Sequence, residues 1–391
     1  MGATENEIKT ESSATSYCTT FENVQEAAMR IRNIAHRTPV LTCSTMDEIV
    51  SSSHERNVKI FFKVEAMQKT GSFKFRGALN AVKSLVNESK EKQESAKNEI
   101  VSLQVVTHSS GNHAQALALA AKLASVESSS CNVHATIVMP KNAPEIKKRA
   151  VEGYGAEIIL VENTNEAREE KADAVVAERG ASFIHPSEDP RVIAGQGTVC
   201  LEMVEQCTQI MHTSNAADNT SNKNSSPLDI VVIPVGGGGL ASGNIIALRG
   251  LLGDSVKIIL AEPQELNDAK RSFYGKSLVG HDPNKPLTSV ADGLKTTLGP
   301  NTWPIVRDLA DDVLTVSEAA ILRATKFVWE RLKVCIEPSA GVGVAVVMGE
   351  EFQNKYVIGN NGDIEVLKIG IVLCGGNVDI VKVAKMMEAV A

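Results

Sequence analysis

The sequence has few aromatic residues, no excess of basic residues and no long apolar run. Phe, Trp and Tyr make up 4% of the 391 residues, so the core must consist mainly of Ala, Val, Ile and Leu. These residues suit buried parallel strands that are covered by helices. Asp and Glu outnumber Lys and Arg by 47 to 40, a balance that disfavours nucleic-acid binding. No apolar stretch approaches the roughly 18 residues of a membrane-spanning helix.

The cysteines and the first residues of the chain bear on its compartment. The chain has seven cysteines, an odd number, and no C-x-x-C pair. We therefore expect free thiols in a reducing compartment rather than a disulfide framework or a zinc site. Residues 1–18 are polar and lack the apolar core of a signal peptide, so we expect a disordered tail and a cytoplasmic protein.

Apolar, β-branched segments alternate with helical segments along the chain. This alternation predicts an α/β fold in which parallel sheets are wound by helices. In such sheets ligands bind beyond the carboxyl ends of the strands, so we expect the chemistry in the loops that follow them. Polar stretches at 87–99, 125–132, 212–227 and 359–364 are expected to be surface loops. The expected strands cover residues 59–65, 103–108, 135–140, 156–162, 229–235, 256–262 and 367–374.

Four consecutive glycines follow the expected strand 229–235 and precede a helix. Their backbone N–H groups can converge on one anion, and the helix N-terminus adds a positive dipole end, so the loop suits a phosphate. The alternative is a tight turn. The loop also fits G-x-G-x-x-A up to Ala241, and Glu262 ends the next strand, so an NAD-dependent dehydrogenase stays open on this feature. The glycines are Gly236, Gly237, Gly238 and Gly239.

A second loop, at residues 69–77, carries a lysine between a strand and a helix. We expect Ser72 to cap this helix and Lys74 to lie near its N-terminus in apolar surroundings. Both effects disfavour the ammonium form and lower the lysine pKa. A neutral lysine is the nucleophile that a Schiff base requires. The alternative is an ordinary solvated lysine.

Two further loops follow strands. The loop from His108 to His113 offers hydroxyl, amide and backbone donors at the start of a helix. Its alternative interpretation is a capped helix start in which both histidines are packed imidazoles. The loop from Cys374 to Asn377 lies at the ligand end of the sheet, and its alternative is a simple turn.

The four loops together resemble the fold-type II pyridoxal-phosphate (PLP) enzymes, the group of serine and threonine dehydratases and serine racemases. The resemblance runs from about residue 20 to residue 382. It implies an α/β fold like that of the tryptophan synthase β chain, with two lobes that each hold a twisted, mainly parallel sheet covered by helices. The small lobe would be 104–187, and the large one 19–103 with 188–391, including a polar insert at 212–227. The motifs are KTGSFKFRGALNAV, THSSGNHAQAL, HPSEDPRVIAGQGT, PVGGGGLASG, ADGLKTTLGPNTWPI, VWERLK, IEPSAGVGVAVV and LCGGNVD.

The resemblance implies a PLP site in these loops. In that family the lysine of the SFK motif, here Lys74, binds PLP as a Schiff base, and the glycine loop holds the phosphate. Asn112 would hydrogen-bond the ring hydroxyl. Cys374 would face the pyridine nitrogen and leave it largely unprotonated, since no carboxylate stabilises a pyridinium there. The substrate carboxylate would be received at a helix N-terminus by Ser109, Ser110, Gly111 and Asn112.

The resemblance further implies interconversion of L- and D-serine, with β-elimination of serine to pyruvate and ammonia. Lys74 would act as a base on one face of the α-carbon and Ser110 on the other face. Ser110 is the residue that favours a racemase over a dehydratase. A non-catalytic binding protein is disfavoured because the lysine, the phosphate loop and the second base are all present.

Two residues depart from the serine racemase pattern. Ala114 follows SSGNH where Gly is usual, and Ser187 stands where the vertebrate-type enzymes have Asn. An L-threonine/L-serine dehydratase and an aspartate racemase of the same family therefore stay open. An aspartate substrate would need a cation for its side-chain carboxylate, and Arg168 and Arg191 are the candidates.

The resemblance also implies a divalent cation, an ATP site and a homodimer. Glu262, the carbonyl of Leu266 and Asp268 would bind Mg²⁺ or Ca²⁺, which prefer oxygen ligands; the alternative is a surface acidic pair. ATP would act as an allosteric activator at the subunit interface, although Cys43, Gln25 and Thr45 depart from the family pattern there. The matching ATP positions are Ser44, Lys69, Thr70, Gln115, Tyr154, Lys333 and Asn377.

Overall fold

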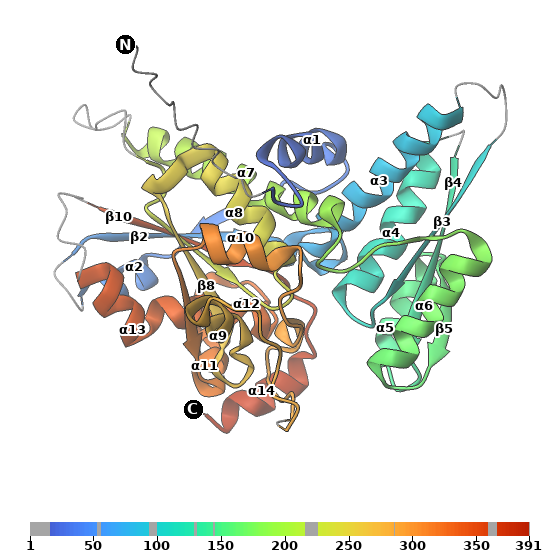
Figure 1. Cartoon of the computed structure of the whole chain (residues 1–391). Helices are drawn as coiled ribbons and strands as arrows, with labels where there is room; N and C mark the ends of the chain where they lie inside the picture. Colours follow the sequence, from blue (N-terminus) through green and yellow to red (C-terminus); the bar gives the residue numbers. More distant parts are fainter. Residues whose placement is uncertain are drawn as a thin grey trace, which may run out of the picture.

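Two sheets, each flanked by helices, lie at opposite sides of the molecule in Figure 1, a computed structural model. Helix α3 (Lys74–Gln93) runs from the centre of the molecule, where it starts with Lys74, towards the smaller sheet. The structure describes residues 16–52, 56–93, 100–128, 131–143, 145–215, 226–284, 286–358 and 366–390.

The larger sheet has six strands in the order β1-β2-β10-β7-β8-β9. Edge strand β1 is antiparallel to β2, and the other neighbours are parallel. All five residues of β7 are buried, as expected for a parallel strand that is covered on both faces. The strands are β1 (Val40–Thr42), β2 (Val58–Val64), β7 (Ile230–Pro234), β8 (Lys257–Pro263), β9 (Asp312–Val316) and β10 (Leu367–Leu373).

The smaller sheet has four parallel strands in the order β5-β4-β3-β6. Its strands are β3 (Val101–His108), β4 (Cys131–Pro140), β5 (Glu157–Val161) and β6 (Ser182–Phe183). Side chains of β3 alternate between its two faces: Val105 packs in one apolar cluster with α4 (Asn112–Glu127), and Val106 packs in another with α6 (Asn165–Arg179). This alternation places helices on both faces of the sheet.

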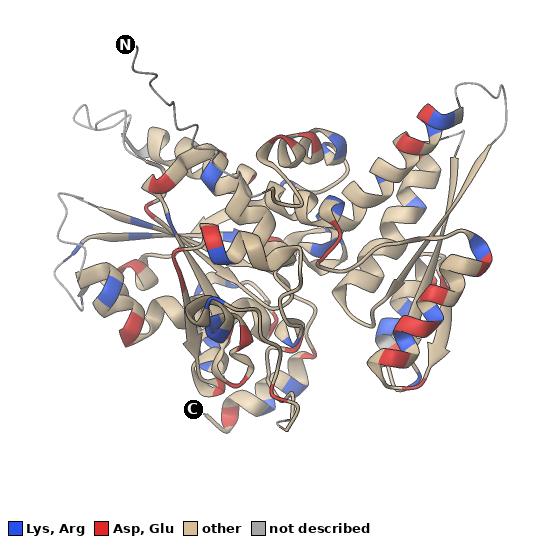
Figure 2. Ribbon diagram, in the orientation of Figure 1, with Lys and Arg blue, Asp and Glu red and all other residues tan. Residues whose placement is uncertain are grey.

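Helices also cover both faces of the six-stranded sheet. In Figure 1, α1, α7, α8 and α10 lie on one side of it, and α11, α12 and α14 lie on the other. Figure 2 shows acidic and basic residues interspersed over most of these helices, although α12 has none and α8 has only Arg249. The bounds are α1 (Phe21–Ile31), α2 (Ser44–Ser52), α5 (Glu145–Gly153), α7 (Pro190–Asn215), α8 (Gly239–Leu252), α9 (Asp268–Gly275), α10 (Thr302–Leu309), α11 (Glu318–Phe327), α12 (Pro338–Met348), α13 (Glu350–Phe352) and α14 (Ile380–Glu388).

Three of the expected surface loops are partly wrong. Helix α3 continues to Gln93, α4 to Glu127 and α7 to Asn215, so each takes up the first residues of a predicted loop. The start of 87–99 is rich in Glu, Lys and Gln, which are good helix formers on an exposed face, so polarity alone did not mark a loop. Residues 94–99, 129–130, 216–225 and 359–365 lie outside the described residues, as do residues 1–15 of the expected tail.

The seven cysteines are all free thiols, as expected from their spacing. Among the described residues, no helix is both long enough and apolar enough to cross a membrane.

Candidate active site

Lys74 lies at the start of α3, in the centre of the molecule. Its Nζ donates a hydrogen bond to the Pro186 carbonyl at 2.8 Å and lies 5.1 Å from the centre of the Phe73 ring. Burial lowers the pKa of the Lys74 ammonium to about 8, although Cys374 and Glu337 act in the opposite direction. A substantial share of neutral amine therefore exists near physiological pH.

Ser72 does not cap this helix, so that prediction was wrong. Its backbone is extended, with φ −162° and ψ 160°, and forms a bridge with Gly375. The buried Ser72 hydroxyl has no hydrogen-bond partner. The backbone N–H of Phe73 instead donates to the Cys374 carbonyl at 3.1 Å. These contacts join the lysine loop to the loop after β10.

The glycine loop follows β7, and α8 begins at Gly239. Gly238 has φ +81°, a left-handed conformation that favours glycine. A Cβ at Gly237 would lie 2.6 Å from Ser187 Oγ, and a Cβ at Gly239 would lie 2.9 Å from Ser187 Cα. The loop thus needs glycine for close packing, and the first N–H groups of α8 lack acceptors within the helix. Both features suit an anion site.

Asn112 begins α4 and joins two other loops. Its Nδ2 donates to Glu337 Oε1 at 3.0 Å, and its Oδ1 accepts a hydrogen bond from Asn377 Nδ2 at 2.9 Å. Asn377 also donates to the Thr70 carbonyl at 2.7 Å. No side chain caps α4 at Gly111, so the predicted alternative of a capped helix start is wrong. The free N–H groups of this helix end can receive a carboxylate.

Glu337 is a site residue that the sequence reasoning missed. It precedes α12, and burial raises the pKa of its carboxyl to about 7. Its charge acts on both Lys74 and Cys374. The available signal was a lone acid in an apolar stretch directly before Pro338, but the sequence did not show which loops it faces.

Cys374 follows β10 and is buried. Burial raises the pKa of its thiol well above the ordinary value, and the Glu337 carboxylate adds to this effect. The thiol is therefore neutral at physiological pH, which is the state expected from the sequence for a group that faces the pyridine nitrogen.

The segment 184–188 connects the lysine, the glycine loop and α10. Besides accepting the Lys74 hydrogen bond at Pro186, it places Ser187 against the glycines. The carboxylate of Glu188 accepts hydrogen bonds from the Asn301 backbone N–H and the Thr302 hydroxyl, both at 2.7 Å. The segment therefore links Lys74, the glycine loop and the start of α10.

The three histidines near this segment are packed imidazoles. His108 lies 5.1 Å from the Phe183 ring, and His113 is buried with Nε2 3.3 Å from the Ile184 carbonyl. His185 Nδ1 accepts backbone hydrogen bonds, and burial lowers the pKa of this ring to about 4. All three rings are therefore neutral at physiological pH, because burial also lowers the pKa values of His108 and His113.

Glu262 and Asp268 both lie in the interior, so the alternative of a surface acidic pair is wrong. Their exposed fractions are 1% and 2%. The Glu262 carboxylate accepts the backbone N–H groups of Ala269 at 2.8 Å and Lys270 at 3.0 Å. Burial and Asp268 raise the pKa of Glu262 well above its usual range.

One carboxyl oxygen of Asp268 has a polar partner, and the other has none. Oδ1 lies 3.2 Å from His281 Nδ1, and the buried Oδ2 has no hydrogen-bond partner. Burial raises the pKa of Asp268 to about 6. Leu266, the expected carbonyl ligand, lies in the short turn between Glu262 and Asp268. Within the described part of the chain, no group of three His, Cys, Asp or Glu side chains forms a metal site, so a cation here would need backbone or water oxygens.

The residues expected at an ATP site come from several elements. Lys69 and Thr70 form a turn beside Asn377, and Thr70 has φ 60°. The others are spread over the fold: Ser44 begins α2, Gln115 lies in α4, Tyr154 follows α5, and Lys333 has φ 59° at the end of a π-helical turn.

The two arginines considered for an aspartate side chain differ. Arg191 pairs with Asp189, with Nε at 3.0 Å and Nη2 at 2.7 Å from its carboxylate. Arg168 is near the start of α6 and donates to the Thr164 carbonyl and to Asn165. Arg191 is therefore committed to an ion pair, and Arg168 is the more available cation.

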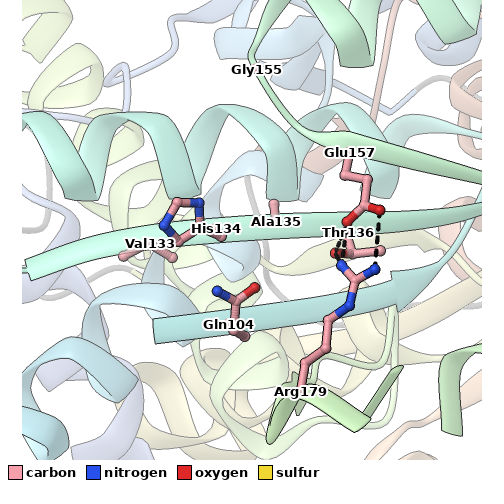
Figure 3. A pocket seen from close by; sticks show the side chains of 8 residues that line it. All are labelled: Gln104, Val133, His134, Ala135, Thr136, Gly155, Glu157 and Arg179. Atoms are coloured by element: carbon pink, nitrogen blue, oxygen red, sulfur yellow. Dashed lines mark hydrogen bonds and ion pairs between the residues drawn. The ribbon is translucent and has the colours of Figure 1, made fainter. Parts of the chain in front are cut away.

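A separate polar pocket of about 260 Å³ lies on the smaller sheet (Figure 3). Arg179 and Glu157 form an ion pair at its edge. It contains none of the predicted site residues. Its lining residues are Gln104, Val133, His134, Ala135, Thr136, Gly155, Glu157 and Arg179.

Comparison with known proteins defines the class of this site. The model of the pyridoxal-phosphate dependent enzymes matches residues 31–362, and the chain belongs to this family. The family match confirms the predicted family and fold class and excludes the NAD-dependent dehydrogenase.

Among the relatives, the chain is 44% identical over 365 residues to the human serine racemase, covering 93% of each chain. The maize serine racemase structure is 37% identical, with a TM-score of 0.78 over 95% of this chain and 98% of that chain. A PLP-dependent aspartate racemase structure is 36% identical, with a TM-score of 0.75 over 94% and 98%.

Proposed function

We propose that this chain is a serine racemase, which interconverts L- and D-serine and also eliminates water from serine to give pyruvate and ammonia. The observation that carries the proposal is the Lys74 amine, whose pKa burial lowers to about 8 and which donates to the Pro186 carbonyl, in the segment that packs on the glycine loop. The human and maize serine racemases that it resembles along nearly the whole chain support the same activity.

The residues present fit PLP. The glycine loop and the α8 N-terminus offer free N–H groups to the phosphate, and Lys74 offers a largely desolvated amine for the Schiff base. Asn112 would hydrogen-bond the ring hydroxyl, and the neutral Cys374 thiol would face the pyridine nitrogen. When bound, PLP supplies an electron sink that acidifies the α-hydrogen of an amino acid.

Two side chains would then move protons at the α-carbon. We assign Lys74 Nζ to one face of the α-carbon and Ser110 Oγ to the other face. One group removes the α-proton, and the other delivers a proton to the opposite face, which inverts the configuration of the α-carbon. Ser110 lies in the loop between β3 and α4 and is half-buried. Loss of the β-hydroxyl after proton removal would give the competing elimination.

The N-terminus of α4 would hold the substrate carboxylate. Because no side chain caps this helix, its first N–H groups remain available to an anion. Ser109, Ser110, Gly111 and Asn112 would surround the carboxylate there. This contact would fix the α-carbon relative to the lysine.

Glu262, the Leu266 carbonyl and Asp268 would hold Mg²⁺ or Ca²⁺. The fit rests on the buried Asp268 Oδ2, which lacks a partner, and on the charge of Asp268, which raises the pKa of the buried Glu262 and which a cation would offset. Each Glu262 oxygen accepts one backbone hydrogen bond and keeps a further lone pair. Water would complete the six to eight oxygen ligands that Ca²⁺ prefers.

The remaining expectations from the family resemblance are also proposals. We propose a homodimer and an ATP site that includes Thr70 and Asn377, which are adjacent because Asn377 Nδ2 donates to the Thr70 carbonyl. The free thiols support a cytoplasmic location. A small domain at 104–187 within a large one is supported by the two sheets, since every strand of the smaller sheet lies between 101 and 183.

Aspartate is the second candidate substrate. The aspartate racemase structure resembles this chain almost as well as the serine racemase structures do, and Arg168 is available to pair with a carboxylate near His108. Threonine is the third, through the dehydratase reaction, since a threonine deaminase structure also resembles the chain.

A substrate panel tests the proposal. L-serine, L-threonine and L-aspartate are each incubated with the PLP-loaded enzyme, D-enantiomer is measured by chiral chromatography, and keto acid by coupled reduction. We expect D-serine and pyruvate from L-serine. Keto acid alone would make the protein a dehydratase, and D-aspartate alone would make it an aspartate racemase.

A further inference from the structure

We propose that His281 links the cation site to the PLP phosphate loop, so that the cation and PLP strengthen each other's binding. This inference rests on the proposed cation and PLP sites and adds a regulatory contact between them. It starts from a histidine that neither the PLP site nor the proposed cation ligands include.

His281 lies between the two sites. Its Nδ1 is 3.2 Å from Asp268 Oδ1, and its Nε2 is 2.9 Å from the Lys295 carbonyl oxygen. A carbonyl only accepts, so Nε2 carries a hydrogen and donates it there. The side chain is 15% exposed, which is consistent with an imidazole held on two sides.

The first contact orients Asp268. Because Oδ1 faces His281, the partnerless oxygen is Oδ2, the atom that would bind the cation. A ligand carboxylate that is fixed by a second group binds a metal more tightly than a freely rotating one. His281 therefore acts as a positioning residue for Asp268.

The second contact reaches the wall of the phosphate loop, which we define as residues 294–298. A Cβ at Gly236 would lie 2.8 Å from Leu294 Cα, and a Cβ at Gly238 would lie 2.6 Å from Leu298 Cδ2. The wall thus touches the loop at both ends, and the Lys295 carbonyl that His281 binds lies within it.

A cation that immobilises Asp268 would therefore stabilise the wall at Lys295 through His281. A more rigid wall holds the glycine N–H groups in place for the phosphate, which lowers the ordering cost of PLP binding.

Thermodynamic linkage makes the effect measurable from either side. The factor by which Ca²⁺ lowers the Kd of PLP must equal the factor by which PLP lowers the Kd of Ca²⁺. We expect a factor of about five or more in the wild type, the lower end of typical couplings. The Kd of PLP is obtained by titrating the full-length apoenzyme, with Ca²⁺ or with a chelator, and following the visible absorption of bound PLP. The Kd of Ca²⁺ is obtained by calorimetry on apoenzyme and holoenzyme.

The decisive variant is His281→Leu, which fills the space and removes both polar contacts. We expect it to bind Ca²⁺ and PLP with a linkage factor below about two. His281→Gln can still donate to the Lys295 carbonyl, so we expect it to restore part of the linkage factor. If His281→Leu does not fold, His281→Gln is used in its place. His134→Leu is the matched control, because His134 is an exposed histidine on the smaller sheet (Figure 3).

Two results would overturn the inference: a linkage factor of one in the wild type, or an undiminished factor in His281→Leu. Racemisation of L-serine is measured on the same wild-type preparation. If the wild-type enzyme racemises serine but shows no linkage, only this inference is wrong. If the enzyme shows the linkage but forms no D-serine, the proposed function is wrong and the inference stands.

Discussion

The lowered pKa of Lys74 predicts how PLP enters the apoenzyme. Only the neutral amine attacks the aldehyde of PLP, so the rate of loading should follow the neutral fraction of Lys74. With a pKa of about 8, roughly one-tenth of the lysine is neutral at pH 7. An ordinary lysine of pKa about 10.5 would be neutral in roughly one part in 3,000 at pH 7. Burial should therefore raise the rate of PLP loading at pH 7 about 300-fold.

The assay is rapid mixing of apoenzyme with PLP from pH 6 to pH 10.5, following the visible absorption of the bound cofactor. We expect the loading rate to rise about tenfold per pH unit below 8 and to level off above it. Glu337 raises the pKa of Lys74, so Glu337→Gln should move the midpoint to lower pH. A wild-type rate that still climbs tenfold per unit near pH 10 would refute the reasoning.

The same shift has a consequence for apoenzyme stability. A lysine whose folded pKa lies below its unfolded pKa binds fewer protons in the folded state, so stability rises with pH between the two values. Between about pH 8 and pH 10.5, the apoenzyme should gain on the order of 3 kcal/mol relative to Lys74→Met. Denaturant unfolding of both proteins at pH 7 and pH 10 measures the difference, and equal pH dependence would contradict it.

Three further predictions concern single substitutions. Gly237→Ala should weaken PLP binding at least about tenfold, because its Cβ would lie 2.6 Å from Ser187 Oγ; an unchanged Kd in an absorbance titration would contradict this. Arg76→Ala should lower the free energy of unfolding by about 3–5 kcal/mol, because it leaves the buried Glu65 carboxylate without its ion-pair partner, and Lys257→Ala on the surface is the denaturation control. Asp268→Ala should abolish the rise in melting temperature that Ca²⁺ gives the wild type, and a retained rise would place the cation elsewhere.

The sequence predicted the long elements well and the short ones poorly. The expected strand 229–235 differs from β7 (Ile230–Pro234) by one residue at each end, because a β-branched run before four glycines has clear limits. Strand β1 was missed, since three residues at an antiparallel edge carry no periodic signal. The helical ends of α3 and α7 were missed because exposed polar residues occur in both helices and loops.

The candidate site shows the same division between local and distant information. Loops that follow parallel strands could be singled out in both sheets, which led to Lys74 and the glycines after strands of the larger sheet and to Asn112 after β3 of the smaller sheet. Glu337 lies 225 residues from its partner Asn112, and no local pattern joins them. Ser72 has the sequence position of a helix cap, but its backbone pairs with Gly375 and its buried hydroxyl has no hydrogen-bond partner. Distant pairings of this kind depend on packing that the sequence alone does not reveal.

Proton transfer on two faces of the α-carbon can be followed in D₂O with L-serine as the substrate. Wild type and Ser110→Ala, both loaded with PLP, are compared for D-serine carrying deuterium at the α-carbon and for pyruvate. The two-base account predicts deuterated D-serine from the wild type, and pyruvate with no D-serine from Ser110→Ala. Deuterated D-serine formed by Ser110→Ala at the wild-type rate would contradict it.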